Sequence, residues 1–399
     1  MLKISDFTIN LSSRMIVLFV NQISSIALLY FMISRLDINQ FGIISSALII
    51  YNIIFIIIEW GFTIYSINSL KFLSHLEQEK KISAILWAKI IFFCFSILII
   101  IYFFKKNIIL YEDYYLLISL IFLILVSVFN PLWLLQFLNK TELLLIPTIF
   151  FKILQIFIVY FFLKNEYSFL IVLSQAVSFF FISLYAYIYI IKKFDLFKIV
   201  RFSEIINVIK SSKSIFFNTL NQNFSHSLWG IYLIFFGNNI HVSIFNLADT
   251  FFRAGNSLTS IFPEVLLRTH KKKVDLKKIY FLIFLVILIS ISLFISAEYF
   301  IINYLDQIFF DNMIFFYITI FSWFVISIIK IIAYPFFSKK KNLRFLNLIS
   351  FLTMFAHFSS ILFFIIFFAK INLNYISSTY LFISLSSLLV FLTKLKKKN

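Results

Sequence analysis

The chain contains twelve mostly apolar segments, and each is long enough to cross a membrane as a helix. A hydrocarbon core about 30 Å thick is crossed by about 20 helical residues. The apolar residues run continuously and do not alternate, which excludes a membrane β-barrel. We therefore expect an all-α polytopic membrane protein with twelve transmembrane helices. The segments are 15–34, 43–66, 82–104, 114–137, 143–163, 168–191, 214–237, 242–267, 279–300, 312–336, 345–369 and 373–393.

The composition excludes other classes of protein. Of the 399 residues, 62% are hydrophobic and 13% are charged, whereas soluble domains carry about 25% charged residues. A soluble enzyme and a disordered chain are therefore excluded. The one cysteine, Cys94, lies inside an apolar segment, so neither a disulfide framework nor a cysteine-based metal site is expected. No small-residue cleavage site follows the first apolar segment, so we expect an uncleaved first span and not a signal peptide.

The basic residues predict the orientation in the membrane. The chain has 35 Lys and Arg against 17 Asp and Glu, a net charge of +18. If the N-terminus is cytoplasmic, 26 of the 35 basic residues fall in inside segments and 5 in outside loops. Basic residues of short loops stay in the cytoplasm, so both termini are predicted to be cytoplasmic. Basic clusters at this face attract anionic membrane lipids, and no nucleic-acid partner is needed to explain the charge.

The longest inside loop divides the spans into two equal sets. This loop, 192–213, has six predicted spans before it and six after it. We expect an N-terminal six-helix half at 1–195, a cytoplasmic linker at 196–213 and a C-terminal six-helix half at 214–399. Two related halves around a central cavity are typical of alternating-access transporters.

Amide side chains recur at matching depths in the first and the seventh predicted spans. Asn21 and Gln22 lie near the start of the first span, and Asn221 and Gln222 near the start of the seventh, one turn after Asn218. Hydrogen bonds between helices could explain one or two such amides. The seventh span carries more polar residues than packing requires, so we expect these amides to face the central cavity.

Charged residues within spans are the most informative, because a charge at mid-bilayer costs about 2.5–3.5 kcal/mol on insertion scales. Lys152 is central in the fifth span and Arg253 in the eighth, with Asp249 one turn before Arg253. This Asp–Arg pair either joins helices structurally or lines a water-filled cavity. Glu59 and Lys89 lie nearer a cytoplasmic boundary, where a functional role and snorkelling to the interface both remain open.

Other polar residues within spans have simpler interpretations. Lys330, Glu264 and Glu298 lie close to span ends, so we expect them to anchor at the membrane interfaces. His226 has no second histidine or carboxylate at ligand spacing, so no metal site is expected. The sequence also has no phosphate-binding glycine loop, nucleophile elbow or zinc-protease motif, and we expect neither enzymatic activity nor a cofactor.

Four short stretches suggest a family. They are Phe41-Gly42, Glu59-Trp60-Gly61, NPLWLLQFLNK at 130–140 and VSIFNLADTFFRAGNSLTSIFPEVL at 242–266. The last is similar to an eighth span with an Ala-acid core, a later basic residue and a proline. Together with the twelve spans and the basic inner face, these stretches resemble the O-antigen and polysaccharide flippases (Wzx type) of the multidrug/oligosaccharidyl-lipid/polysaccharide exporter superfamily.

The resemblance implies a substrate and roles for individual residues. The substrate would be an oligosaccharide repeat unit linked by pyrophosphate to undecaprenol, moved from the inner to the outer leaflet. Arg253 and Lys152 would contact the phosphates, and Lys89 would be a charge on the cytoplasmic side of the path. Asp249 and Glu59 would carry a coupling proton. The amides expected to bind sugar hydroxyls are Asn21, Gln22, Asn218, Asn221 and Gln222.

The resemblance also implies a setting and leaves alternatives. It implies a lipopolysaccharide-assembly protein of the bacterial inner membrane, acting beside a polysaccharide polymerase and a chain-length regulator. One alternative is an exporter of drugs or small metabolites from the same superfamily. The other is a membrane polysaccharide polymerase. Polymerases typically have a large extracytoplasmic loop, and the longest outside loop here is 301–311.

Overall fold

The computed structural model describes residues 6–71, 73–105, 114–259, 276–304, 307–337, 343–367 and 371–396. Within these ranges the regular structure is helical and contains no strand, so the predicted all-α membrane fold is confirmed. The α-helices are α1 (Asp6–Arg35), α2 (Ile38–Glu59), α3 (Phe62–Ser69), α4 (His75–Lys105), α5 (Tyr114–Val128), α6 (Leu132–Phe137), α7 (Leu145–Phe162), α8 (Leu170–Ile191), α9 (Phe202–Phe236), α10 (Asn239–Thr259), α12 (Leu276–Tyr304), α13 (Gln307–Phe310), α14 (Met313–Phe337), α15 (Leu343–Phe367) and α16 (Leu373–Lys396).

Ten helical stretches of the described residues are long and apolar enough to cross a membrane. The helices α9 and α10, which correspond to the seventh and eighth predicted spans, do not meet that standard. Among the described residues of α9 the apolar stretch is Ser227–Phe236, and the sequence before it is rich in amide and hydroxyl residues. In α10 the charged residues Asp249 and Arg253 interrupt the apolar sequence. The chain is a multi-pass membrane protein in which these two helices are unusually polar.

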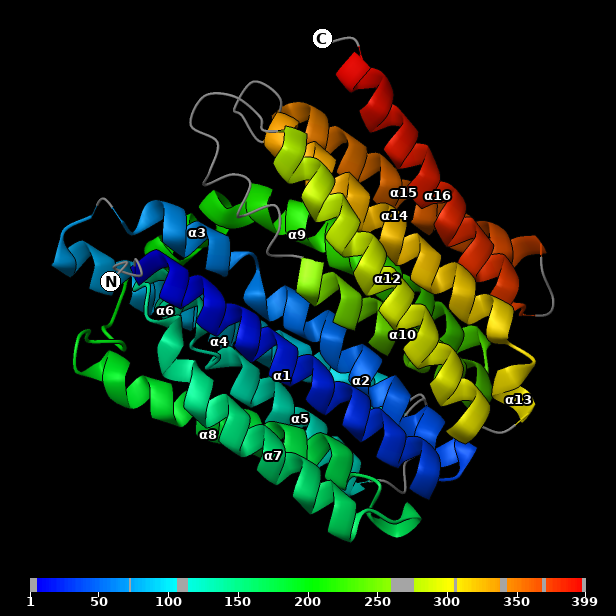
Figure 1. Ribbon diagram of the computed structural model, residues 1–399. Coiled ribbons are helices and arrows are strands. Elements are labelled where there is room, and N and C mark those ends of the chain that lie inside the picture. Colours follow the sequence, from blue (N-terminus) through cyan, green and yellow to red (C-terminus); the bar gives the residue numbers. More distant parts are fainter. Residues whose placement is uncertain are drawn as a thin grey trace, which may run out of the picture. The chain divides into compact units, whose positions relative to one another are not determined.

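The chain divides into two compact units, Met1–Asn223 and Phe224–Asn399. In the first unit, α5 packs against α8 and α2, while α7 packs against α1 and α8 (Figure 1). Its core includes the buried side chains of Ile85, Trp133 and Leu134. Hydrogen bonds within each long helix pair its backbone groups, as a membrane requires, and the apolar side chains pack between the helices.

The second predicted span is broken where a continuous helix was expected. Trp60 and Gly61 both adopt the left-handed region, with φ of 42° and 70°, and separate α2 from α3. A Cβ on Gly61 would lie 2.8 Å from Ile215 Cγ2, so only glycine fits. The Trp60 ring stacks on Phe216 at 3.7 Å between centroids, and its indole N–H donates to the carbonyl of Ile209. The break therefore fits the first half of α9 against α2 and α3.

In the second unit, α14 is the central helix and packs against α16, α12 and α10. At Gly255 of α10, a Cβ would lie 2.4 Å from the Trp323 ring of α14. One turn further on, the hydroxyls of Thr259 and Ser327 are 3.2 Å apart. Since the contact advances by one turn along both helices, α10 and α14 run in the same direction.

The predicted linker 196–213 is helical from Phe202 onward, where α9 begins. The Glu204 side chain accepts a hydrogen bond from the Arg201 backbone N–H, a capping interaction that starts the helix. Before the helix, Glu79 of α4 accepts hydrogen bonds from the Asp195 N–H and the Lys198 ammonium. The bond to Glu79 raises the pKa of Lys198. The division between the two units falls inside α9, and the domain boundaries at 195 and 213 stay a prediction.

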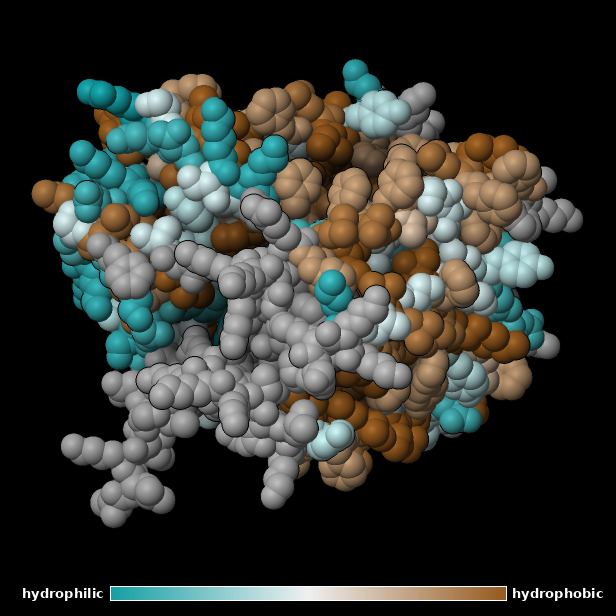
Figure 2. Space-filling view, turned by 90° about the horizontal axis from the view of Figure 1, so that it is seen from above, coloured by the Kyte–Doolittle hydropathy of each residue, from teal (hydrophilic) through white to brown (hydrophobic). Residues whose placement is uncertain are grey.

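The outward-facing side chains are largely apolar. Figure 2 shows one face on which hydrophobic side chains predominate over much of the surface, while hydrophilic side chains gather toward one side. Phe161 of α7, Phe351 of α15 and Phe382 of α16 are among the exposed large residues. Apolar surface of this extent is suited to contact with lipid and not with water.

Candidate functional site

The structure joins Glu59 and Lys89, two residues whose roles the sequence left open. The Lys89 ammonium lies 2.8 Å from a Glu59 carboxylate oxygen, with the Lys89 side chain 0% exposed. The Thr63 hydroxyl donates a hydrogen bond to the other Glu59 oxygen, and the ammonium lies 5.4 Å from the centroid of the Trp133 ring. Lys89 is therefore neutralised inside the first unit and does not reach an interface. The predicted proton role of Glu59 and entrance role of Lys89 stay predictions.

Lys152 is buried in α7, as its central position predicted, at 4% exposure. Its ammonium donates to the Gln155 side-chain oxygen at 2.8 Å and lies 4.3 Å from the centroid of the Phe179 ring. None of the ion pairs among the described residues includes Lys152. A buried ammonium held by a neutral amide and a ring is costly, and it can attract an anion.

The predicted Asp249–Arg253 pair is formed within α10. Arg253 Nε donates to Asp249 at 2.6 Å, with Asp249 3% and Arg253 33% exposed. Arg253 Nη2 also donates to the hydroxyl of Ser227 on α9, at 3.3 Å. The pair thus links α10 to α9, and its guanidinium is the more accessible partner.

Lys330 contacts the polar stripe of α10 that is formed by Asp249, Arg253 and Asn256. Its predicted role as an interfacial anchor stays a prediction. Its ammonium donates to the side-chain oxygen of Asn256, which lies one turn after Arg253 on α10. Lys330 is on α14, and its partner is far away in sequence. The depth of a residue in its span predicts how far a side chain must reach, but it does not predict which neighbouring helix the side chain meets.

A second buried contact in this unit was also absent from the sequence predictions. The Trp229 indole N–H donates to His357 Nδ1 at 3.3 Å, so this nitrogen carries no proton. The His357 ring lies 4.8 Å from the Tyr380 ring, and Tyr380 contacts Phe252 of α10 edge-on. This aromatic cluster supports α10 at the residue next to Arg253.

The predicted sugar-binding amides are only partly described. Asn21 and Gln22 are half-buried on α1, and the Asn21 side-chain oxygen has no hydrogen-bond partner among the described residues. Asn218, Asn221 and Gln222 lie on α9, but their side chains are outside the described part of the structure. Glu264 and the lysine cluster at 271–273 also lie outside it.

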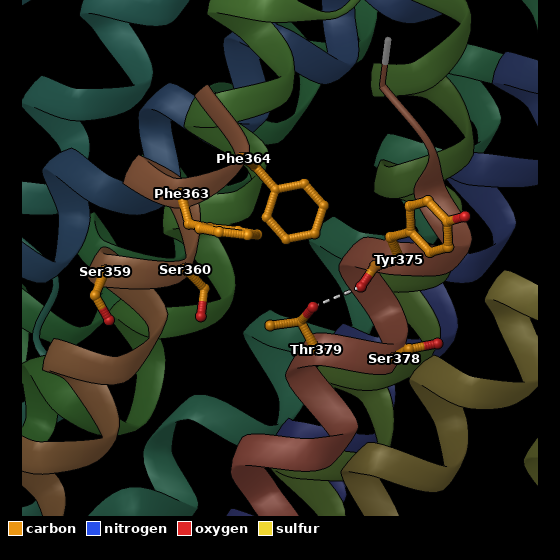
Figure 3. Close-up of a pocket in the computed structure, with 7 residues that line it drawn as sticks. All are labelled: Ser359, Ser360, Phe363, Phe364, Tyr375, Ser378 and Thr379. Atoms are coloured by element: carbon orange, nitrogen blue, oxygen red, sulfur yellow. Dashed lines mark hydrogen bonds between the residues drawn. The ribbon is translucent and has the colours of Figure 1, made fainter. Parts of the chain in front are cut away.

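An open pocket of about 520 Å³ lies between α15 and α16. Figure 3 shows Phe363 and Phe364 directed into the gap between the two helices. The hydroxyls of Ser359, Ser360 and Thr379 donate to carbonyls of their own helices. The lining residues are Ser359, Ser360, Phe363, Phe364, Tyr375, Ser378 and Thr379. The lining has no charged side chain and none of the predicted site residues.

The described charges within the spans favour anions. In the second unit two cations, Arg253 and Lys330, accompany two described acids, Asp249 and Glu298, and Glu298 lies apart near the end of its span. In the first unit Glu59 neutralises Lys89, and Lys152 adds a further cation. The first unit therefore carries one more cation than acid at depths where charge is expensive, and in the second unit the two cations lie together near α10. The arrangement suits the binding of a negatively charged group and includes no nucleophile–base pair.

The sequence matches no protein-family model and no curated protein. Its fold does match solved structures. The MATE multidrug transporter DinF-BH is similar with a TM-score of 0.66 and 14% identity over 99% of this chain and 96% of that one. An outward-facing multidrug resistance MATE family transporter of the MOP superfamily gives a TM-score of 0.54 and 12% identity over 98% and 94%. The chain therefore has the fold of MATE transporters of the MOP superfamily.

Proposed function

We propose that this protein is a non-enzymatic flippase for undecaprenyl-pyrophosphate-linked oligosaccharides. It moves repeat units from the inner to the outer leaflet of the bacterial inner membrane, with both of its termini in the cytoplasm. The surface polysaccharide, such as O-antigen, is then assembled from these units by a polymerase and a chain-length regulator. The MATE-type fold supports transport, and the flippase role is the further step proposed here.

The buried Lys152 ammonium, together with the Arg253 and Lys330 cations close to each other in the second unit, is the observation that carries the proposal. A pyrophosphate must shed water to cross the membrane, and fixed cations lower that barrier. Arg253 and Lys152 are positioned within the spans, and none of the ion pairs among the described residues includes Lys152. Half-buried amides such as Asn21 supply hydrogen-bond partners for sugar hydroxyls.

An exporter of drugs or small metabolites is the second candidate. It is favoured by the similarity of the fold to MATE multidrug transporters. The two candidates differ in the charge of the cargo. A site for organic cations would need surplus acid, whereas the described spans carry surplus base.

Gene deletion in the source bacterium distinguishes the two candidates. Loss of surface polysaccharide with unchanged drug tolerance is expected for the flippase. The deletion strain is then complemented with the wild-type gene, with the double variant Arg253→Gln/Lys152→Gln, or with Lys394→Gln. Lys394 lies at the end of α16 against Phe345 and serves as the matched control. The wild type and the control should restore the polysaccharide, and the double variant should not. Restoration by the double variant would refute the proposal.

A further inference from the structure

We propose that Arg253 and Lys330 form a two-point binding site for a diphosphate, in which each cation contacts one phosphate group. This inference rests on the proposed function for the identity of the anionic substrate. It adds Lys330, which acts with Arg253 to select a diphosphate over a monophosphate.

The spacing of the two cations comes from α10. Arg253 and Asn256 are three residues apart, so their Cβ atoms lie about 5–6 Å apart on one face of the helix. The Lys330 ammonium is bonded to the Asn256 side-chain oxygen, which places it within about one turn of Arg253. The two phosphate groups of a diphosphate share a single bridging oxygen, so Arg253 of α10 and the Lys330 ammonium, which α14 brings to Asn256, can each contact one of them.

Both cations keep donors for a ligand. A guanidinium has five N–H donors, and the bonds of Arg253 to Asp249 and Ser227 use Nε and Nη2. An ammonium has three donors, and the described bond of Lys330 uses one of them, to a neutral amide. Asp249 offsets one of the two positive charges, so the stripe retains a net charge that a diphosphate would balance.

Packing between α10 and α14 fixes the position of Lys330. The contact of Gly255 with Trp323 and the bond of Thr259 with Ser327 lie on both sides of Asn256. Asn256 is a positioning residue, because its amide oxygen holds the ammonium toward α10. A long lysine side chain loses considerable rotamer freedom when a ligand fixes it in place. Because Asn256 already holds Lys330 before the anion binds, less entropy is lost on binding and the anion binds more tightly.

An interfacial anchor would give Lys330 a different chemistry. An anchor needs only a charge near lipid headgroups. If Lys330 were an anchor, its removal would weaken the binding of all anions equally or of none. A diphosphate site predicts a selective loss. The two roles therefore separate in a comparison of pyrophosphate with orthophosphate.

The test is calorimetric titration of the purified full-length protein in lipid nanodiscs with inorganic pyrophosphate or orthophosphate. Wild-type protein should bind pyrophosphate more tightly than orthophosphate. Lys330→Gln should weaken pyrophosphate binding about tenfold to a hundredfold, because a hydrogen bond to a charged group is lost, and should change orthophosphate binding little. Lys330→Arg should retain the preference, and the control Lys394→Gln should match the wild type. Lys330→Met, which keeps the apolar stem, replaces the Gln variant if that protein does not fold.

Two results would overturn the inference: equal binding of the two anions by the wild type, or undiminished pyrophosphate binding by both uncharged Lys330 variants. A failure of the proposed function would give a different combination of results in the deletion and binding experiments. If deletion of the gene leaves surface polysaccharide intact while pyrophosphate binding still depends on Lys330, the flippase is refuted and the diphosphate site is supported. If polysaccharide is lost but Lys330→Gln binds pyrophosphate normally, only the diphosphate site is refuted.

Discussion

Lys89 and Glu59 form an ion pair at the break between α2 and α3, with the ammonium 2.8 Å from the carboxylate. The break orients the end of α2, and Thr63, in the first turn after the break, holds the second carboxylate oxygen. The pair thus ties α4 to the point where the second predicted span changes direction. Its stability depends on both charges being present together.

Removal of one partner should therefore lower the stability of the first unit more than removal of both partners. Lys89→Met leaves the Glu59 carboxylate without its cation and should destabilise the first unit by about 3 kcal/mol, the low end for buried pairs because Glu59 is partly exposed. The double variant Lys89→Met/Glu59→Gln should recover most of that loss. Thermal unfolding of the purified protein checks both values, and an unchanged melting temperature for the single variant would contradict the ion pair.

Replacement of Lys152 should raise the stability of the protein while it lowers polysaccharide export. Its ammonium is buried against Gln155 and Phe179, so Lys152→Met replaces an expensive charge with an apolar chain of similar length. We expect a gain of about 1 kcal/mol or more in stability together with reduced polysaccharide export. Thermal unfolding and surface-glycan staining measure the two effects. A variant that is less stable than the wild type would show that Lys152 is held structurally.

Close packing at Gly255 should control the position of Arg253 and Asn256 on α10 relative to Lys330 on α14. A Cβ there would overlap the Trp323 ring at 2.4 Å, so Gly255→Ala should separate α10 from α14 at a cost of about 1–3 kcal/mol. Trp323→Leu should relieve the overlap and restore part of the stability in the double variant. Thermal unfolding provides the comparison. Equal stability of Gly255→Ala and the wild type would contradict this packing.

His357 should act as a hydrogen-bond acceptor for Trp229. Asn presents its side-chain oxygen near the position of Nδ1, so His357→Asn should retain the bond and most of the stability. His357→Leu removes the acceptor of a buried indole N–H and should cost about 1–3 kcal/mol. Unfolding monitored by tryptophan fluorescence compares the two variants. A Leu variant as stable as the Asn variant would exclude a stabilising role for this bond.

Several features of the fold follow from local sequence. Continuous apolar segments can cross lipid only as helices once a barrel is excluded, so the all-α fold and the positions of ten of the twelve predicted spans were predictable. The Asp249–Arg253 bond was predictable because four residues along one helix bring the two side chains together. The burial of Lys152 likewise followed from its central position in the fifth span.

Other features depend on which helices are neighbours. The left-handed residues Trp60 and Gly61 lie within an apolar run, and they are explained by Ile215 and Phe216 of α9. The Lys330–Asn256 contact requires knowledge that α10 and α14 are adjacent and run in the same direction. Hydropathy reports the depth of a residue but not the rotation of its helix or its neighbours. The sequence therefore predicted the depth of the charged residues in their spans, but it did not predict which side chains they contact on other helices.

Translocation of the lipid itself tests the claim that the protein is a flippase. Purified protein is reconstituted into liposomes that carry an undecaprenyl-pyrophosphate-linked oligosaccharide, and an added glycosidase reports the fraction exposed on the outer leaflet over time. We expect continuing exposure of the inner-leaflet pool with the wild type and with Lys394→Gln, and exposure at the rate of protein-free liposomes with Arg253→Gln/Lys152→Gln. A wild-type rate equal to that of protein-free liposomes, from protein shown to be folded, would contradict the claim.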